Sequence, residues 1–253
     1  MVRRSDCQAF SGRLRSGIVE AVFFDAAGTL FDLRRSAGFF YLEFARRHGF
    51  EPAHEGLTEK ELEESFQKEF RKSPPLSFPG AESSSLVELE RNWWYRIVVN
   101  VFEKWGHFAG FDSFFDEIYS FFGTAEPWVL EEGCLELLDY LRAGDFQMGV
   151  ISNFDSRLFG LLEELRISKY FQCVTISSQS LAAKPDPRIF QAAVARIGLE
   201  ESQCLHLGDR LSDDFEGARG AGLQAVLYDP DGRCKDRSVI RITKLTELCQ
   251  VLV

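Results

Sequence analysis

Asp25 is the first residue in the chain whose position suggests chemistry. It follows an apolar run at residues 18–24 and precedes the small residues Gly28 and Thr29. A carboxylate at the end of a buried strand lies where α/β sheets bind ligands, beyond the carboxyl edge of the sheet. An aspartate in this position can also simply cap the following turn. The segment by itself leaves both interpretations open.

Three further polar segments follow apolar runs in the same way. Ser152 and Asn153 end one run and offer a hydroxyl and backbone N–H groups to an oxyanion. Lys184 comes just before a helix that begins with proline, so its ammonium group can reach inward as a point charge. Asp209 and Asp214 follow another run, and clustered carboxylates suit a hard divalent cation such as Mg²⁺.

The elements that must position these residues alternate along the chain. Short apolar runs rich in β-branched and aromatic residues predict buried strands at 18–24, 146–152, 173–176, 204–208 and 224–228. Helical patterns separate them at 133–142, 157–165, 187–197 and 214–221. This alternation predicts an α/β fold, a Rossmann-like parallel sheet with helices on both faces. All four polar segments would then meet at one edge of the sheet.

One segment, residues 33–124, interrupts the alternation. It contains no convincing strand and predicts four helices, at about 36–48, 58–72, 85–104 and 111–122, two of them opening with the capping boxes Thr58-x-x-Glu61 and Ser85-x-x-Glu88. The segment holds 14 of the 24 phenylalanines, which we expect mainly to form its own core. We therefore predict a core domain of residues 18–32 and 125–253, an all-helical insertion at 33–124, and an N-terminal extension at 1–17.

Composition excludes several classes of function. The 253 residues carry a formal net charge of −10, which argues against a broad nucleic-acid surface. No apolar run approaches the roughly 20 residues of a membrane span, and residues 1–17 lack the apolar centre of a signal peptide. The six cysteines lie at least 15 residues apart, so we expect them to be reduced in a cytoplasmic protein.

Taken together, the four segments resemble those of the haloacid dehalogenase-like hydrolase superfamily. The motifs occur in order: Asp25 to Thr29, then Ser152, then Lys184, then Gly208-Asp209 with Asp214. The helical insertion resembles the family's cap of the first type. The resemblance covers essentially residues 18–252.

The resemblance implies a role for each motif residue. Asp25 would be the nucleophile that attacks phosphorus and forms an aspartyl-phosphate. Mg²⁺ would be held by Asp25, the backbone carbonyl of Ala27 and Asp209, supported by Asp214 or its neighbour Asp213. The substrate would be a small phosphorylated metabolite, and the protein a monomer or a homodimer.

The phosphoryl group would be held by several groups at once. Ser152 would donate to a phosphoryl oxygen, together with the backbone N–H groups around Ala26, Ala27 and Asn153. Gly28 and Thr29 would bind substrate in the same loop. Lys184 would offset negative charge on the nucleophile and on the group being transferred.

Ala27 departs from the phosphatase pattern. Phosphatases of this family usually carry a second aspartate two residues after the nucleophile, which protonates the leaving group and then activates water. General acid–base catalysis supplies about 10² to 10⁴ in rate, so hydrolysis of ordinary alkyl phosphates should be impaired. Asp32, His48 and His107 are candidate substitutes, each better explained by a structural role.

Three alternatives remain beside a phosphohydrolase. A 2-haloacid dehalogenase also lacks the second aspartate, but Gly208-Asp209 and Asp214 argue against it. A phosphonatase-like enzyme would need a cap lysine, and Lys60, Lys68 and Lys72 form no matching motif. The third is a family member that binds phosphate weakly or without catalysis. The substrate cannot be derived from the sequence.

Overall fold

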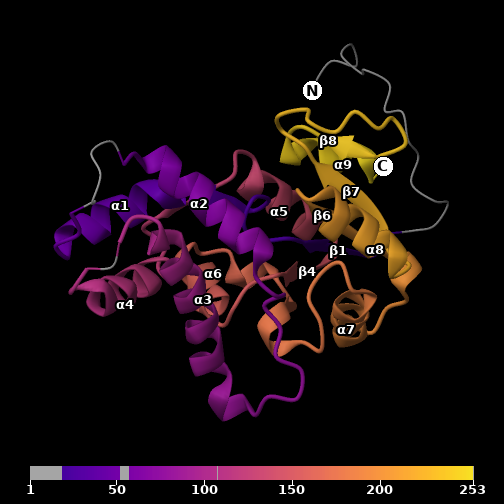
Figure 1. Ribbon diagram of the computed structural model, residues 1–253. Coiled ribbons are helices and arrows are strands. Elements are labelled where there is room, and N and C mark those ends of the chain that lie inside the picture. Colours follow the sequence, from indigo (N-terminus) through magenta and orange to yellow (C-terminus); the bar gives the residue numbers. More distant parts are fainter. Residues whose placement is uncertain (1–18, 52–56, 107, 253) are drawn as a thin grey trace.

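The computed structural model describes residues 19–51, 57–106 and 108–252. Cys7, His107 and the predicted extension at 1–17 lie outside the described residues. Figure 1 shows the helices α1–α4 gathered at one end of the molecule and the sheet at the other. No helix within the described ranges is long and apolar enough to span a bilayer.

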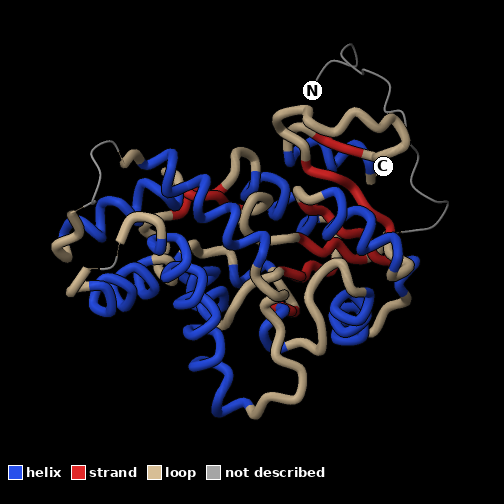
Figure 2. Tube along the Cα trace, in the orientation of Figure 1, coloured by secondary structure: helices blue, strands red, loops and turns tan. Residues whose placement is uncertain are grey.

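The core is a six-stranded parallel sheet in the order β5-β4-β1-β6-β7-β8 (Figure 2). Its strands are β1 (Ala21–Phe24), β4 (Gln147–Ser152), β5 (Cys173–Ile176), β6 (Cys204–Gly208), β7 (Gln224–Tyr228) and β8 (Arg241–Ile242). The first five agree with the predicted strands to within a few residues, and β8 was not predicted. The predicted Rossmann-like α/β fold is therefore confirmed.

Helices cover both faces of this sheet. Along β1, Val22 and Phe24 face one apolar core and Ala21 and Phe23 face the other, as expected for a central strand. The first core includes α5 (Cys134–Ala143), α6 (Arg157–Glu164) and α9 (Leu248–Val251), and the second includes α7 (Pro187–Ile197) and α8 (Gly217–Gly220). Where a helix at 214–221 was predicted, a π-helical turn (Leu211–Glu216) precedes α8. Short 3₁₀ turns occupy Ser168–Tyr170, Ser177–Gln179, Glu201–Gln203 and Leu245–Glu247.

The helices α1 (Ala37–Arg47), α2 (Glu59–Lys72), α3 (Leu86–Glu103) and α4 (Phe111–Phe121) enclose an apolar core of their own, rich in aromatic rings. We call this bundle, residues 33–124, the cap. Thr58 caps α2 with Glu61 as predicted. The predicted capping box at Ser85 is wrong, because a 3₁₀ turn (Ser83–Ser85) precedes α3 and the Ser85 hydroxyl donates to the Glu82 carbonyl instead.

Two short strands join the cap to the core. β2 (Phe31–Leu33) pairs antiparallel with β3 (Trp128–Leu130), so the chain leaves and re-enters the core through adjacent strands. Three-residue strands carry too little periodicity to be seen in the sequence, and neither was predicted. The pair fixes the point at which the cap is attached.

Candidate active site

Asp25 lies at the carboxyl edge of the sheet, between the ends of β4 and β6. The strand register aligns Phe24 with Val150 on one side and with Leu207 on the other. The backbone N–H of Asp25 donates to the carbonyl of Leu207 at 2.9 Å, which continues the sheet pairing up to the carboxylate. Ser152 ends β4 and Asp209 directly follows β6, so these two residues lie on either side of Asp25.

Three carboxylates converge at this edge. One oxygen from each of Asp25, Asp209 and Asp214 lies within 4.8 Å of the other two. Oδ1 of Asp209 is buried and has no hydrogen-bond partner among the described residues. Burial and the negative charges of Asp25 and Asp214 raise the pKa of Asp209 to about 7. An unpartnered carboxylate oxygen beside two others fits a hard divalent cation.

Lys184 provides the positive charge of the cluster. Its Nζ lies 2.7 Å from Oδ1 of Asp25 and 2.6 Å from Oδ1 of Asp214, and the side chain is almost fully buried. Burial alone would lower the pKa of the ammonium group, but the two carboxylates raise it above its ordinary value. Lys184 is therefore protonated, and it neutralises part of the charge on Asp25.

Asn153 holds the loop that carries Lys184. Its side-chain amide donates to the Lys184 carbonyl at 3.0 Å, and its Oδ1 accepts from the Lys184 backbone N–H at 2.8 Å. The two bonds tie the end of β4 to a segment 31 residues further along the chain. The prediction assigned Asn153 to phosphate through its backbone. The second role of its side chain was missed.

Asp214 is tied to its surroundings rather than free. Its Oδ1 accepts from Lys184 and contacts Nε2 of His206 at 2.9 Å, and its Oδ2 accepts from the Arg210 backbone N–H at 2.9 Å. Although burial opposes ionisation, Lys184 and His206 lower the pKa of Asp214. His206 is fully buried, and burial lowers its pKa. Its role was missed because a histidine inside an apolar strand gives no pattern of its own.

Two glycines allow the carboxylates to approach the backbone. Gly28 adopts a φ of +88°, and a Cβ built there would lie 2.9 Å from Cγ of Asp209. A Cβ on Gly208 would lie 2.2 Å from Cγ of Asp214. Both positions need glycine for this close approach, and Gly28 needs it for its backbone conformation as well.

The remaining candidates differ in their surroundings. Ser152 is buried at the end of β4, and Thr29 is fully buried with a hydroxyl that lacks a partner among the described residues. Asp213 faces Arg210, with 3.7 Å between their charged groups. Asp32 is exposed on β2, and His48 pairs with Glu117 inside the cap. Neither Asp32 nor His48 belongs to the carboxylate cluster.

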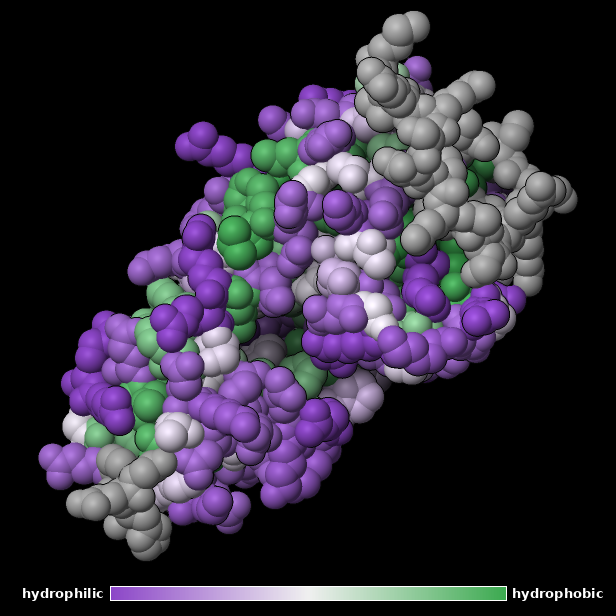
Figure 3. All heavy atoms as spheres, turned by 90° about the horizontal axis from the view of Figure 1, so that it is seen from above, coloured by the Kyte–Doolittle hydropathy of each residue, from purple (hydrophilic) through white to green (hydrophobic). Residues whose placement is uncertain are grey.

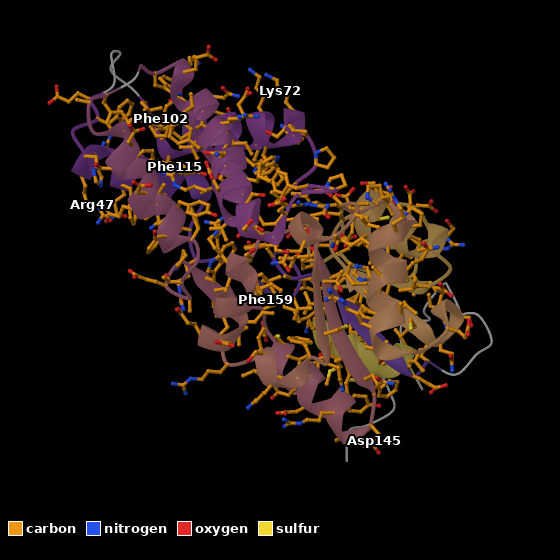
Figure 4. The ribbon with its side chains drawn as sticks, turned by 90° about the horizontal axis from the view of Figure 1, so that it is seen from below. Arg47, Lys72, Phe102, Phe115, Asp145 and Phe159 are labelled. Carbon is orange, nitrogen blue, oxygen red and sulfur yellow. The ribbon has the colours of Figure 1, made fainter. Side chains whose placement is uncertain are left out.

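Buried polar contacts join the cap to the loop after β4. Trp94 of α3 donates through Nε1 to Oδ2 of the fully buried Asp155 at 2.6 Å. The buried Glu90 accepts from the backbone N–H and hydroxyl of Ser156 at 3.1 and 2.8 Å. Figure 4 shows Phe115 in the cap and Phe159 of α6 in the adjoining part of the core. The cap thus contacts the segment that directly follows Ser152 and Asn153.

The adjacent tryptophans Trp93 and Trp94 both pack against the cap core, and Trp94 also reaches the core domain. Trp93 packs into the cap core and donates to the Pro74 carbonyl at 2.9 Å, whereas Trp94 contacts Asp155 of the core. Neighbouring helical residues point about 100° apart, so two adjacent tryptophans were not expected to share one core. Here they do, because Phe70 of α2 contacts both rings.

A family model described as haloacid dehalogenase-like hydrolase matches residues 19–222. The chain belongs to this family. The human haloacid dehalogenase-like hydrolase domain-containing protein 3 is 31% identical over 215 residues, which cover 83% of this chain and 81% of that protein. The Rhythmically expressed gene 2 protein of Drosophila melanogaster is 28% identical over 216 residues, covering 81% of each.

Solved structures share the fold. The HAD-hydrolase YfnB from Bacillus subtilis, bound to magnesium, aligns with a TM-score of 0.71 at 19% identity, over 93% of this chain and 99% of that one. A 2-haloacid dehalogenase from Pseudomonas syringae aligns with a TM-score of 0.63 at 24% identity, over 93% and 98%. Phosphatases and dehalogenases are both built on this fold, so the likeness does not choose between them.

Proposed function

We propose that this hydrolase is a Mg²⁺-dependent phosphohydrolase that acts on a small phosphorylated substrate through an aspartyl-phosphate on Asp25. The observation that carries the proposal is the cluster of Asp25, Asp209 and Asp214 around the buried Lys184. A dehalogenase needs no cation and has no use for the unpartnered oxygen of Asp209. The magnesium bound to YfnB supports the same choice of cation.

The cation would be held by Asp25, Asp209 and the backbone carbonyl of Ala27. When bound, it neutralises negative charge that would otherwise repel a phosphate dianion. Asp214 already accepts from Lys184 and Arg210, so we assign it to positioning Lys184 rather than to direct coordination.

Asp25 attacks the phosphorus, and its carboxylate oxygen forms the new bond as the leaving oxygen departs. Lys184 stays protonated and balances charge on Asp25 and on the transferring group. Ser152 and the backbone N–H groups of Gly28, Thr29 and Asn153 hold the phosphoryl oxygens. Water then attacks the phosphorus of the aspartyl-phosphate, and the bond between phosphorus and the Asp25 oxygen breaks. The proton lost by the water leaves with the released phosphate, and the carboxylate is regenerated.

We also propose that the cap, residues 33–124, closes over this site about the β2–β3 pair. Closure would exclude water from Asp25 during the first step. The polar contacts from Trp94 and Glu90 to the loop after Ser152 support this, because they make that loop sensitive to the position of the cap. The magnesium-bound structure of YfnB reveals interdomain movement in that protein.

The experiment is a turnover screen of the purified protein over phosphorylated compounds, with Mg²⁺ and with EDTA. Activity should require Mg²⁺, and Asp25→Asn should abolish it while the protein stays folded, because an amide is a poor nucleophile. Activity that persists in EDTA, or in the Asp25→Asn variant at saturating Mg²⁺, would refute the mechanism.

Ala27 favours a second candidate, a family member that binds phosphate without efficient turnover. The missing carboxylate removes the usual proton donor, while the cation and phosphate groups remain. Tight binding of orthovanadate in Mg²⁺ together with no turnover of any phosphate compound would select this candidate.

A further inference from the structure

A cavity of about 90 Å³ lies between the cap and the core, and its walls are almost entirely apolar. Thirteen of the described residues line it, and eight of these are aromatic. Figure 3 shows the surface hollowed between the two parts of the molecule, with apolar atoms in the hollow. The cavity is too small for a nucleoside. It is also smaller than the roughly 150 Å³ cavity that encloses benzene, so it admits a single ring only because it is open to the surface hollow.

On its core side, the cavity is lined by close chain neighbours of the proposed phosphate-binding loops. Phe154, which lines it, is the second residue after Ser152. Leu33 and Trp128 line it from β2 and β3, and β2 begins at Phe31, whose carbonyl accepts from the Gly28 N–H at 2.8 Å. A group attached to a phosphoryl group at Asp25 would therefore extend toward these walls.

The charge in the cavity wall is already neutralised. Among the described lining residues only Arg157 is charged, and its Nε and Nη2 donate to Oδ1 and Oδ2 of Asp155 at 2.8 and 2.6 Å. Its Nη1 donates to the Tyr119 carbonyl at 2.6 Å, and the guanidinium lies 3.8 Å from the centroid of the Tyr119 ring. Three of the five N–H donors of Arg157 therefore have partners, and its positive charge is balanced by Asp155.

Ala27 restricts the leaving group independently. Its methyl group cannot donate a proton, so a leaving group that departs without a proton is favoured. Aryl oxides leave far more readily in this way than alkoxides.

Resting on the proposed function, we infer that the leaving group is a flat, uncharged aromatic ring. The substrates would then be aryl phosphate monoesters, and the ring would occupy the cavity lined by Trp94, Trp128 and Phe154. Sugar phosphates, nucleotides and phosphorylated carboxylic acids are disfavoured, because the described lining offers their polar groups little beyond the hydroxyls of Tyr41 and Tyr119 and the paired Arg157.

The test compares binding of phenylphosphonate and methylphosphonate in Mg²⁺ by calorimetry, which requires no turnover. We expect phenylphosphonate to bind at least about tenfold more tightly, because the ring is transferred into an apolar site. Val98→Phe fills the cavity from α3 and should remove this preference. The matched control is Val99→Phe on the next residue, which does not line the cavity and should keep the preference.

Ala37→Leu, which narrows the cavity from α1, should act like Val98→Phe, so the test does not depend on one variant folding. Equal affinities for the two phosphonates, or a preference that survives both cavity variants, would overturn the inference. Turnover of acetyl phosphate tests the proposed function separately. If the protein does not hydrolyse acetyl phosphate but still prefers phenylphosphonate, the proposed phosphohydrolase activity is refuted and the inferred preference for aryl ligands stands. Binding of neither phosphonate would overturn both.

Discussion

Replacing Lys184 by methionine tests the electrostatic basis of the site. The methionine keeps most of the volume of the buried stem but removes the ammonium group, which lies 2.7 Å from Asp25 and 2.6 Å from Asp214. Three carboxylates then remain together at one edge of the sheet. His206, which contacts Asp214, is a neighbouring side chain that can become positively charged. Removing one partner of a buried ion pair costs about 3–5 kcal/mol. We expect a loss in that range at pH 8 in the absence of divalent cations.

The loss should shrink as the pH falls. Lys184 is one of the groups that hold the pKa of Asp209 down, so without it the folded-state pKa of Asp209 should rise further above that of the unfolded chain. A group with a raised folded pKa contributes stability at low pH that is lost as the pH rises through the folded pKa. In the native protein, burial and acidic neighbours already raise the pKa of Asp209 to about 7. The pH range over which stability changes should therefore lie around this value. The deficit should therefore grow between about pH 5.5 and pH 8.

The assay is urea denaturation of metal-free protein at both pH values, repeated with Mg²⁺. Mg²⁺ should stabilise Lys184→Met more than the native protein, since the cation replaces part of the missing positive charge. Lys60→Met is the control, because Lys60 is 82% exposed and should change the free energy of unfolding by less than about 0.5 kcal/mol. A loss below about 1 kcal/mol at pH 8, or one independent of pH, would refute the buried charge cluster.

Three further predictions concern the same site. In the native protein, Mg²⁺ should raise the midpoint of thermal unfolding more at pH 8 than at pH 6, because protons compete with the cation for Asp209. In differential scanning calorimetry, Asp209→Asn should reduce this difference between the two pH values. Gly28→Ala should weaken Mg²⁺ binding by roughly tenfold or more in calorimetric titration, because the added Cβ displaces the Asp209 carboxylate. An unchanged affinity would contradict the close packing of Gly28 against Asp209. Ala27→Asp should raise turnover of an alkyl phosphate by at most roughly 10²-fold and that of an activated aryl phosphate much less, and an equal effect on both would show that Ala27 does not replace a proton donor.

The parallel sheet could be predicted because each strand carries its own signal. The runs that became β1, β4, β5, β6 and β7 are apolar on both faces and are separated by helical periodicity, which requires no knowledge of distant contacts. Asp25, Lys184, Asp209 and Asp214 could be placed together for the same reason, since the carboxyl ends of parallel strands share one edge. The short strands β2, β3 and β8 escaped because two or three residues cannot show a period.

The residues that hold the site in place could not be predicted, because their roles depend on contacts between distant segments. Asn153 was recognised by its place after Ser152, yet its side chain binds the backbone of Lys184, and nothing local to either segment indicates that pairing. His206 has the sequence context of any residue in a buried strand, but it lies against Asp214. In each case the polar group is explained only by the partner that folding brings to it.

The contacts between the cap and the core link the reacting groups to the choice of substrate. Asp155 lies two residues beyond Asn153 and is fully buried, and it accepts from both Trp94 of the cap and Arg157 of the core. This buried carboxylate neutralises the one cation among the described lining residues of the cavity, so the cavity wall carries little net charge. The end of the site proposed to bind phosphate is highly charged and polar instead, because it is built from carboxylates, an ammonium group and backbone N–H groups. The molecule thus presents a charged end at Asp25 and an apolar end at Phe154, which is the polarity of a phosphorylated ring.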